Sequence, residues 1–276
     1  PDLVVSAIPH FNRVQFESLA LARPGTPFVT VLTDLADYPP HFWIEQQPQF
    51  FICGTEKAVE QARLLGHPPE RIFRASGMIL HPRFYEPVQA DPASERRRLG
   101  LHPDLSTGLV LFGGAGSSEM VKIAEHLARA KVHTQLIMIC GRNERLAHTL
   151  RQSAVKIPMF IEGFTKQVPY YMRIADFFIG KPGPGSVSEA MAMDLPVIVE
   201  SNAWTLPQER YNAEWVREKD AGIVLHSFGK IAAAAAEMIQ PSNMARYRRN
   251  AAAIQNRAVF EIPDMLAHIL ETGAPK

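Results

Sequence analysis

One stretch between Phe177 and Val199 limits the possible folds of this chain more than any other. Two apolar runs, Phe177-Phe178-Ile179 and Pro196-Val197-Ile198-Val199, have the length and composition of short buried strands. A loop with three glycines and two prolines, residues 180–185, follows the first run. Ser186 then stands where a helix N-cap is expected, and Glu189 completes the spacing of a capping box. The stretch therefore predicts a strand, a loop, a helix and a second strand.

Such a loop can present backbone N–H groups and a helix N-terminus to an anion or a polyol at close range. The alternative is an ordinary tight connection in an α/β protein, because glycine and proline mark turns of many kinds. The rest of the chain has to decide between these two interpretations.

Short apolar runs alternate with helix-like segments along most of the chain. In the second half, such runs are found at 109–112, 135–140, 160–161, 177–179, 196–199 and 223–225, and in the first half at 3–7, 28–32, 50–53 and 71–73. Strands that alternate with helices at this spacing favour parallel sheets covered by helices on both faces. The composition shifts between Pro87 and Pro103. We therefore predict an α/β fold with Rossmann-like domains at residues 1–90 and 104–276, joined by a linker at 91–103.

Composition excludes several classes of function. The net charge of +1 creates no strong field for nucleic acid, so no nucleic-acid partner is expected. Cys53 and Cys140 lie in or beside apolar runs without metal-type spacing, which is typical of reduced thiols in a cytosolic protein. No apolar run approaches the length of a membrane span. The triplet Arg96-Arg97-Arg98 predicts a solvated helix face, or else a contact with anionic lipid head groups.

Parallel sheets bind ligands at the carboxyl ends of their strands. Two glycine-rich loops, residues 113–118 and 180–185, follow such strands and lead to helix N-termini, which suits a diphosphate. The carboxylate of Glu189 could hold a ribose diol through charge-assisted hydrogen bonds. The fingerprint G-x-G-x-x-G is absent in either register, as are the P-loop, an Asp-x-Asp pattern and zinc-type clusters. The residues thus point to a nucleotide diphosphate.

Several motifs in order resemble the nucleotide-sugar domain of glycosyltransferase family 28. They are Gly113-Gly114-Ala115-Gly116-Ser117, Cys140-Gly141-Arg142-Asn143, Gly163-Phe164, Lys181-Pro182-Gly183-Pro184-Gly185-Ser186, Glu189-Ala190 and Gln208-Glu209. The resemblance is greatest to the branch of monogalactosyldiacylglycerol synthases and processive diacylglycerol glucosyltransferases. It runs from about residue 109 to 212 and extends weakly into the first half.

The resemblance implies a GT-B fold, with two Rossmann-like domains of which the first is incomplete here, and with a UDP-sugar held by the second. It implies that Gly114, Ala115, Gly116 and Ser117 meet the diphosphate, that Gly163 and Phe164 meet the uracil, that Glu189 binds the ribose and that Gln208 and Glu209 read the hexose. Arg142, Lys181, Gly183, Pro184, Gly185 and Ser186 complete the expected UDP-sugar site. No metal and no cofactor besides the donor are expected.

Simpler roles remain open for several of these residues. Glu189 could only close its capping box, and Gln208 and Glu209 could be ordinary first-turn residues of a surface helix. Arg142 could be a solvated loop residue. Phe164 could belong to the core, as most aromatic residues do.

Inverting transfer also needs a base for the acceptor hydroxyl. The family carries a glycine-rich loop with a histidine close to the N-terminus, and this chain begins after that point, so we expect a fragment or a diverged member. Asp34, His10 and His41 are the candidate bases, with Asp34 preferred because it follows a predicted strand.

The resemblance implies hexose transfer from UDP-glucose or UDP-galactose to a diacylglycerol-type lipid. The chain is expected in the cytoplasm, peripherally on the inner face of the plasma membrane. Two alternatives stay open: a UDP-N-acetylglucosamine 2-epimerase-like isomerase, and a nucleotide-sugar-binding remnant without catalysis.

Overall fold

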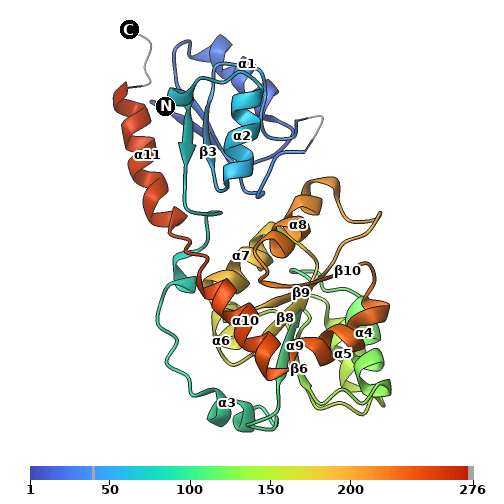
Figure 1. The fold of residues 1–276 in the computed structure, drawn as a ribbon. Coiled ribbons are helices and arrows are strands. Elements are labelled where there is room, and N and C mark those ends of the chain that lie inside the picture. The colour runs from blue at the N-terminus through green and yellow to red at the C-terminus, as the bar shows by residue number, and fades with distance from the viewer. Residues whose placement is uncertain (39–40, 273–276) are drawn as a thin grey trace. The chain divides into compact units, whose positions relative to one another are not determined.

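The computed structural model describes residues 1–38 and 41–272, and the chain divides into two compact units. The first unit comprises residues 1–82, 206–212 and 255–276, and the second comprises residues 83–205 and 213–254. Both units contain a parallel sheet with helices, as the alternation of apolar runs predicts (Figure 1).

The first unit is built on a four-stranded parallel sheet in the order β1-β2-β3-β4. Its core lies on both faces of the sheet. On one face, Phe51 and Cys53 pack with residues of α2, and on the other, Val29 and Ile52 pack with residues of α11. The elements of this unit are β1 (Val4–Ser6), α1 (Asn12–Ala22), β2 (Phe28–Val31), β3 (Phe50–Cys53), α2 (Glu56–Leu64), the 3-10 helix η1 (Pro69–Arg71), β4 (Ile72–Arg74), η2 (Pro82–Phe84) at its boundary, η3 (Pro207–Glu209) and α11 (Ala258–Thr272).

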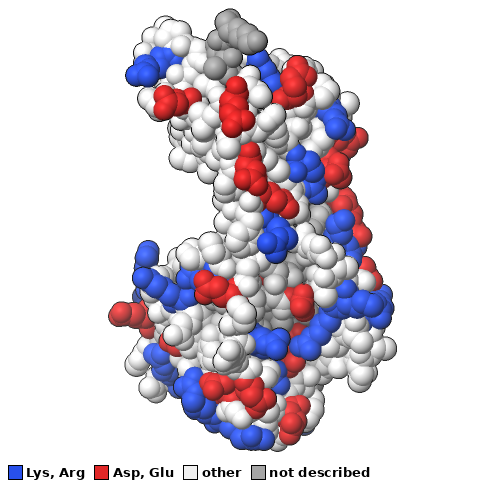
Figure 2. Space-filling model, turned by 90° about the vertical axis from the view of Figure 1, so that its left-hand side faces the viewer, with Lys and Arg blue, Asp and Glu red and all other residues white. Residues whose placement is uncertain are grey.

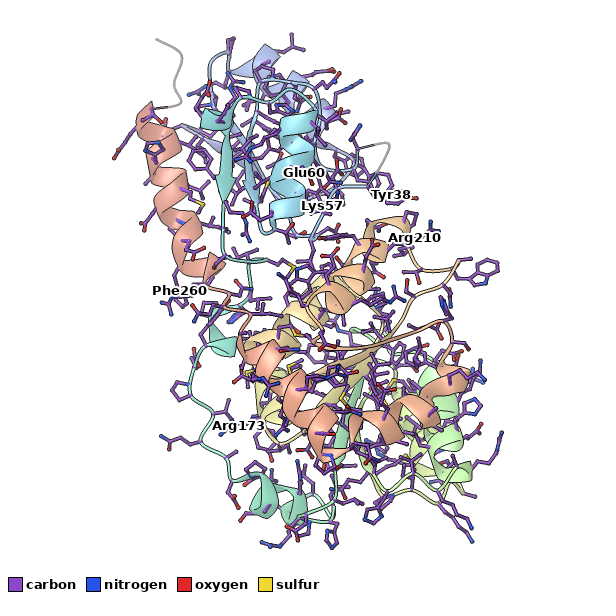
Figure 3. The ribbon with its side chains drawn as sticks, viewed as in Figure 1. Tyr38, Lys57, Glu60, Arg173, Arg210 and Phe260 are labelled. Atoms are coloured by element: carbon purple, nitrogen blue, oxygen red, sulfur yellow. The ribbon has the colours of Figure 1, made fainter. Side chains whose placement is uncertain are left out.

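Local rules account for the helix α2. The Thr55 hydroxyl accepts a hydrogen bond from Ala58 N at 3.1 Å and so caps the N-terminus of the helix. Ala58, Val59 and Ala62 form the buried stripe of this helix. Lys57 and Glu60 lie on its exposed side as an ion pair of 3.5 Å (Figure 3).

The second unit is built on a six-stranded parallel sheet in the order β10-β9-β8-β5-β6-β7. Val110, Met138 and Ile179 point to one face, into a core shared with α4, α5 and α9. Their neighbours Leu109, Ile137 and Phe178 are fully buried on the other face, so helices cover both faces. The elements are α3 (Pro92–Arg98), β5 (Thr107–Leu111), α4 (Glu119–Arg129), β6 (Gln135–Ile139), α5 (Glu144–Arg151), β7 (Met159–Glu162), α6 (Val168–Arg173), β8 (Phe177–Gly180), α7 (Pro184–Ala192), β9 (Val197–Glu200), α8 (Arg210–Glu218, shared by both units), β10 (Gly222–Leu225), η4 (Phe228–Lys230), α9 (Ile231–Met238) and α10 (Pro241–Ala252).

The observed boundaries differ from the predicted ones at several places, among them residues 206–212, which belong to the first unit. Residues 255–276 belong to the first unit, because Ala258, Ile262 and Ile269 of α11 fill the core beneath β2 and β3. The predicted linker at 91–103 contains the helix α3, which belongs to the second unit. The change in composition near residue 90 indicated a domain boundary there. It gave no sign that the C-terminal helix α11 belongs to the first unit.

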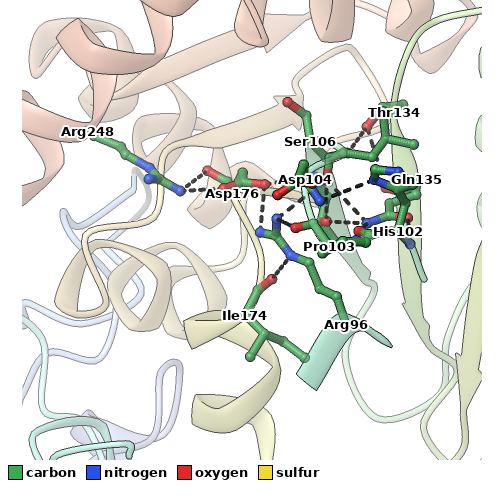
Figure 4. A network of polar contacts seen from close by, with 12 residues as sticks. Arg96, His102, Pro103, Asp104, Ser106, Thr134, Gln135, Ile174, Asp176 and Arg248 are labelled. Atoms are coloured by element: carbon green, nitrogen blue, oxygen red, sulfur yellow. Dashed lines mark hydrogen bonds and ion pairs between the residues drawn. The ribbon is translucent and has the colours of Figure 1, made fainter. Parts of the chain in front are cut away.

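Arg96 fastens α3 to the second unit, which corrects the predicted solvated arginine face (Figure 4). Its side chain is 8% exposed, and its guanidinium pairs with Asp176 at 2.7 Å and donates to the Ile174 carbonyl at 2.8 Å. Asp176 also accepts from Thr107 N at 2.8 Å and from Arg248 at 2.9 Å. A buried, fully paired guanidinium is not available to a lipid head group. Only the other two arginines of the triplet are exposed.

Positive and negative side chains are interspersed over the face drawn in Figure 2, in keeping with the net charge of +1. Both cysteines are buried free thiols, as expected. Within residues 1–38 and 41–272, the helices are all too short or too polar to cross a membrane.

Candidate functional site

The strand order of the second unit creates a switch point between β5 and β8. From β5 the chain proceeds to β6 and β7 on one side, and from β8 it proceeds to β9 and β10 on the other. The loops that leave the carboxyl ends of two such central strands diverge and open a crevice, where α/β proteins bind their ligands. The two predicted glycine-rich loops are the ones that follow β5 and β8.

The loop after β5 is a backbone cradle. Gly113 and Gly116 have φ angles of 71° and 61°, which side chains rarely adopt. The amide groups of Gly114, Ala115 and Ser117 find no acceptor among the described residues. A Cβ atom at Gly114 would meet nothing within 4 Å, so this side of the loop is open. Unpaired amides around an open space suit an anion such as a diphosphate.

The turn after β6 holds the cradle in shape. Arg142 N donates to the Gly114 carbonyl at 2.8 Å, and Asn143 Nδ2 donates to the Ala115 carbonyl at 3.1 Å. A Cβ atom at Gly141 would lie 2.4 Å from the Gly114 oxygen, and its φ of 59° also requires glycine. The structure thus brings together two motifs that are well separated in the sequence.

Helix α7 begins earlier than its sequence predicts, so the expected capping box is wrong. Gly183 is the N-cap, with no side-chain bond, and Pro184 occupies the first helical position. Proline is favoured there because its φ is already helical and it has no N–H to satisfy. Ser186 therefore lies inside the first turn. The amides of Gly185 and Ser186 find no acceptor among the described residues and remain available to an anion.

The shifted helix start releases Glu189 from the role of a cap. Its carboxylate is half-buried and has no hydrogen-bond partner among the residues that the structure describes. Burial raises the pKa of Glu189 from 4.5 to about 7, and nearby Arg83 lowers it to a smaller extent. Partly desolvating an ionised carboxylate without hydrogen-bond donors costs free energy, and the two hydroxyls of a diol would supply those donors. Its position in α7, whose N-terminus is open to an anion, suits a ribose bound beside a diphosphate.

Phe164 and Arg142 form a stacked pair at the edge of the site. Phe164 is 55% exposed, which excludes the core position left open by its sequence. The Arg142 guanidinium carbon lies 4.9 Å from the centre of its ring. The neighbouring Gly163 lies beside the turn after β6, since a Cβ atom there would be 4.0 Å from the Gly141 oxygen. An exposed aromatic ring here offers a surface on which a planar base can stack.

The remaining residues predicted to bind the UDP-sugar are divided between the two units. Lys181 is exposed at the end of β8 in the second unit. Gln208 and Glu209 lie in η3, which belongs to the first unit, whereas the sequence assigned both to the second domain. Glu209 is 7% exposed, so it is not an ordinary residue of a surface helix.

Asp34 lies beyond the carboxyl end of β2 in the first unit, where a ligand-facing residue was expected. It is 6% exposed, and Trp43 Nε1 donates to its Oδ2 at 2.9 Å. Burial raises the pKa of Asp34 to about 6, the hydrogen bond from Trp43 lowers it, and the charges of Glu209 and Asp37 add to the rise. A carboxylate with this pKa is ionised at neutral pH and remains a useful base.

His10 and His41 lie at the same edge of the first sheet. Both have positive φ angles, of 70° and 63°. The centres of the His10 and Phe42 rings are 3.9 Å apart, with the rings tilted by 51°. The charge of His10 lowers the pKa of Asp34 slightly. His41 Nδ1 is 3.3 Å from Asp37 Oδ2, which ties His41 to a different carboxylate. The structure therefore brings all three candidate bases to one edge, with Asp34 the most enclosed.

The sequence reasoning assigned no role to three positioning residues, although Asn143 is part of a quoted motif. Trp43 orients Asp34, and Asn143 holds the cradle while capping α5 through a 2.9 Å bond to Leu146 N. Asp37 is 5% exposed and accepts from Trp43 N at 2.9 Å, so it fixes the turn that carries Trp43. Asn143 before a helix is a recognisable N-cap signal, but no local pattern connects Trp43 or Asp37 to Asp34.

Comparison with known proteins gives a family and a fold. The family model for the glycosyltransferase family 28 C-terminal domain matches residues 109–261. A probable chloroplastic monogalactosyldiacylglycerol synthase 2 of Oryza sativa subsp. japonica is 32% identical over 281 residues, covering 95% of this chain and 57% of the relative. Chloroplastic monogalactosyldiacylglycerol synthase 1 of Arabidopsis thaliana is 30% identical over 253 residues, covering 88% and 46%. The chain spans about half the length of these curated relatives.

Solved structures share the fold at low sequence identity. Anabaena Alr3699/HepE in complex with UDP and glucose has a TM-score of 0.65 at 18% identity, covering 98% of this chain and 78% of that one. MurG of Acinetobacter baumannii has a TM-score of 0.66 at 12% identity, covering 97% and 74%. These likenesses confirm the expected GT-B architecture. The family model covers more than half of the sequence and includes the cradle, the α7 loop and Glu189. The chain therefore belongs to glycosyltransferase family 28.

Proposed function

We propose that this chain transfers a hexose from a UDP-sugar, UDP-glucose or UDP-galactose, to a hydroxyl of a diacylglycerol-type lipid with inversion at the sugar carbon. The unpaired, half-buried carboxylate of Glu189, in the helix that follows the second glycine-rich loop, carries the proposal. The names of the relatives as monogalactosyldiacylglycerol synthases support the lipid acceptor, and the UDP-glucose complex of Alr3699/HepE supports the donor.

Each loop has a defined task in this proposal. The amides of Gly114, Ala115 and Ser117 and of the α7 N-terminus bind the diphosphate and stabilise its charge as UDP leaves. The ring of Phe164 stacks on uracil beside Arg142. Glu189 accepts hydrogen bonds from the two ribose hydroxyls. Gln208 and Glu209 contact the hexose. Ser117 Oγ already accepts from Glu119 N at 3.2 Å, so its own hydroxyl hydrogen is free to face the phosphate.

Asp34 is the proposed general base. It takes the proton of the acceptor hydroxyl as the acceptor oxygen bonds to the anomeric carbon and the bond from that carbon to the UDP oxygen breaks. Its pKa of about 6 keeps it ionised at neutral pH. His10 and His41 are weaker proposals because neither is as enclosed. We also propose that transfer needs no metal ion, because the amides stabilise the leaving diphosphate.

A lipid acceptor places the reaction at a membrane surface, and we propose a peripheral association there. The cytoplasmic face stays a prediction, since the curated relatives are named as chloroplastic. Sedimentation with liposomes tests the association, and transfer in the presence of EDTA tests the independence from metal.

Calorimetric binding of UDP, UDP-glucose and UDP-galactose tests the donor site. We expect Glu189→Ala to weaken UDP binding at least tenfold, as the loss of two hydrogen bonds to a charged group implies (about 1.5 kcal/mol or more). Glu125→Ala, which removes an exposed carboxylate from α4, serves as the matched control and should bind as the parent does. No UDP binding by the folded parent would refute the proposal.

Transfer from labelled UDP-sugars to diacylglycerol in mixed micelles tests the reaction itself. Glycolipid formed by the parent and lost in Asp34→Asn, with UDP binding kept, would support it. Epimerised UDP-N-acetylglucosamine without glycolipid would support the isomerase instead, and UDP binding without turnover of any donor would support the non-catalytic remnant.

A further inference from the structure

A pocket of about 300 Å³ lies at the amino-terminal edge of the sheet in the first unit. Pro27 directly precedes β2, Pro48 lies just before β3, and Arg71 directly precedes β4, and all three line the pocket. Asp34 follows the opposite, carboxyl-terminal end of β2. The pocket is therefore separate from the proposed catalytic edge, and nothing in the proposed reaction uses it.

The walls of the pocket are mostly apolar and firmly held. Phe16, Leu19 and Ala20 of α1 form one side, and Phe50 of β3 forms another. Phe16 packs edge-on against Phe28 at 6.0 Å between ring centres, and Phe50 packs against Phe73 at 6.5 Å. Because these rings belong to the packed unit, the pocket is preformed. A preformed apolar pocket favours an apolar ligand.

Arg71 is the single charged residue of the lining. Its guanidinium carbon lies 5.6 Å from the centre of the Phe50 ring, which holds the charge beside the apolar walls. Its side chain is half-buried and has no hydrogen-bond or ion-pair partner among the described residues. A guanidinium binds carboxylates and phosphates through paired N–H groups, so this cation is complementary to an anionic head group.

We propose that this pocket binds a single-chain amphiphile with an anionic head, the chain lying against Phe16, Leu19 and Phe50 and the head on Arg71. A volume of about 300 Å³ is at the small end of ligand sites and suits one alkyl chain rather than two. The ligand class is therefore a fatty carboxylate or an alkyl phosphate. This inference is independent of the proposed function, because the pocket includes no residue of the donor site.

Calorimetry with the full chain tests the proposal, using decanoate, decyl phosphate and neutral 1-decanol below their aggregation limits. We expect saturable binding of one decanoate or decyl phosphate per chain, and comparing these two probes distinguishes a carboxylate from a phosphate site. Ala20→Phe should fill the pocket and abolish binding of every probe. Arg71→Gln should weaken the anionic probes roughly tenfold, as expected for a lost charge-assisted pair, and leave 1-decanol unchanged.

Arg23→Gln is the matched control, because Arg23 is an exposed arginine just after α1 and does not line the pocket. Circular dichroism and urea unfolding should match the parent in all variants, which shows that each first unit is folded. UDP binding should also be the same in all variants, which separates this test from that of the donor site in the second unit. Non-saturable decanoate binding, or binding that Ala20→Phe does not change, overturns the proposal. Equal affinity for decanoate and 1-decanol overturns the role of Arg71.

If Ala20→Phe proves unfolded, photo-crosslinking decides instead. A diazirine derivative of decanoate should label the parent within residues 16–27 or 48–50, as mapped by mass spectrometry. Labelling confined to other segments refutes the site.

Discussion

Replacing Glu189 by glutamine should make the second unit more stable at neutral pH and weaken its hold on UDP. The pKa of this carboxyl is raised by burial from 4.5 to about 7 in the folded chain. Between these two values, the folded chain keeps a proton that the unfolded chain has released. Stability is therefore lost as the pH rises from about 4.5 to about 7, and the full loss is present above pH 7. A glutamine is neutral throughout and escapes this loss.

The size of the gain follows from the same difference. A pKa difference of one corresponds to about 1.36 kcal/mol, so a shift from 4.5 to about 7 corresponds to about 3 kcal/mol. Because Glu189 is partly exposed, solvent screening reduces this to about 1–2 kcal/mol. Glu189→Gln should thus stabilise the unit by about 1–2 kcal/mol at pH 8 and by almost nothing at pH 4.5.

Thermal or urea unfolding at a series of pH values measures this gain. The transition to follow is the one that UDP shifts, since it reports on the unit that binds the nucleotide. Affinity for UDP-glucose, measured in parallel, should fall in the variant at pH 8. In the parent it should fall about tenfold from pH 8 to pH 6, because only the ionised carboxylate accepts both ribose hydroxyls. UDP-glucose is preferred to UDP because its diphosphate does not titrate in this range.

A structural role for Glu189 predicts the opposite result. If its carboxylate supported the fold, Glu189→Gln would lower stability at pH 8. If it were unrelated to the nucleotide, parent and variant would show the same affinity at every pH. Either observation would refute the assignment of Glu189 to the ribose.

Three further predictions concern the fold, the cradle and the base. Arg96→Met should destabilise the second unit by about 3 kcal/mol in urea because it leaves the partly buried Asp176 carboxylate less paired and the Ile174 carbonyl without its donor. Arg97→Met at an exposed position should change stability by less than about 0.5 kcal/mol. Equal effects would contradict the buried ion pair. Gly141→Ala should lower UDP affinity at least tenfold in calorimetry, because a positive φ and a Cβ 2.4 Å from a carbonyl oxygen force the cradle to move. An unchanged affinity would show that the turn is not part of the site. Trp43→Phe should shift the acid limb of kcat/KM to higher pH, since the lost hydrogen bond favours the charged form of Asp34. A limb that stays in place would count against Asp34 as the base.

Several elements follow directly from local sequence. The alternation of apolar runs and helical segments fixes the parallel sheets, because buried strands and amphipathic helices each have a period that neighbouring residues determine. The loops after β5 and β8 are recognisable from their glycines. Gly113 and Gly116 have positive φ, and a Cβ atom at Gly180 would lie 2.5 Å from the Leu111 oxygen. Thr55 as the cap of α2 is a further case.

The start of α7 shows where local rules compete. Ser186 and Glu189 match a capping box, but Pro184 is better suited to the first helical position and begins the helix sooner than that box allows. The outcome changes Glu189 from a structural group into an unpaired carboxylate. Arg96 shows a similar limit of local sequence patterns. A run of three arginines predicts a solvated helix face, but Arg96 is buried and pairs with Asp176, eighty positions away in the chain.

The sequence by itself therefore determined the fold class, the family and the two glycine-rich loops after β5 and β8, since each of these depends on patterns among residues close together in the chain. Only the tertiary structure decided which side chains lack partners, that Trp43 orients Asp34, and that residues 206–212 and 255–276 join the first unit. These features depend on contacts between residues far apart in the chain. Burial and electrostatic environment arise from those contacts, and no local pattern encodes them.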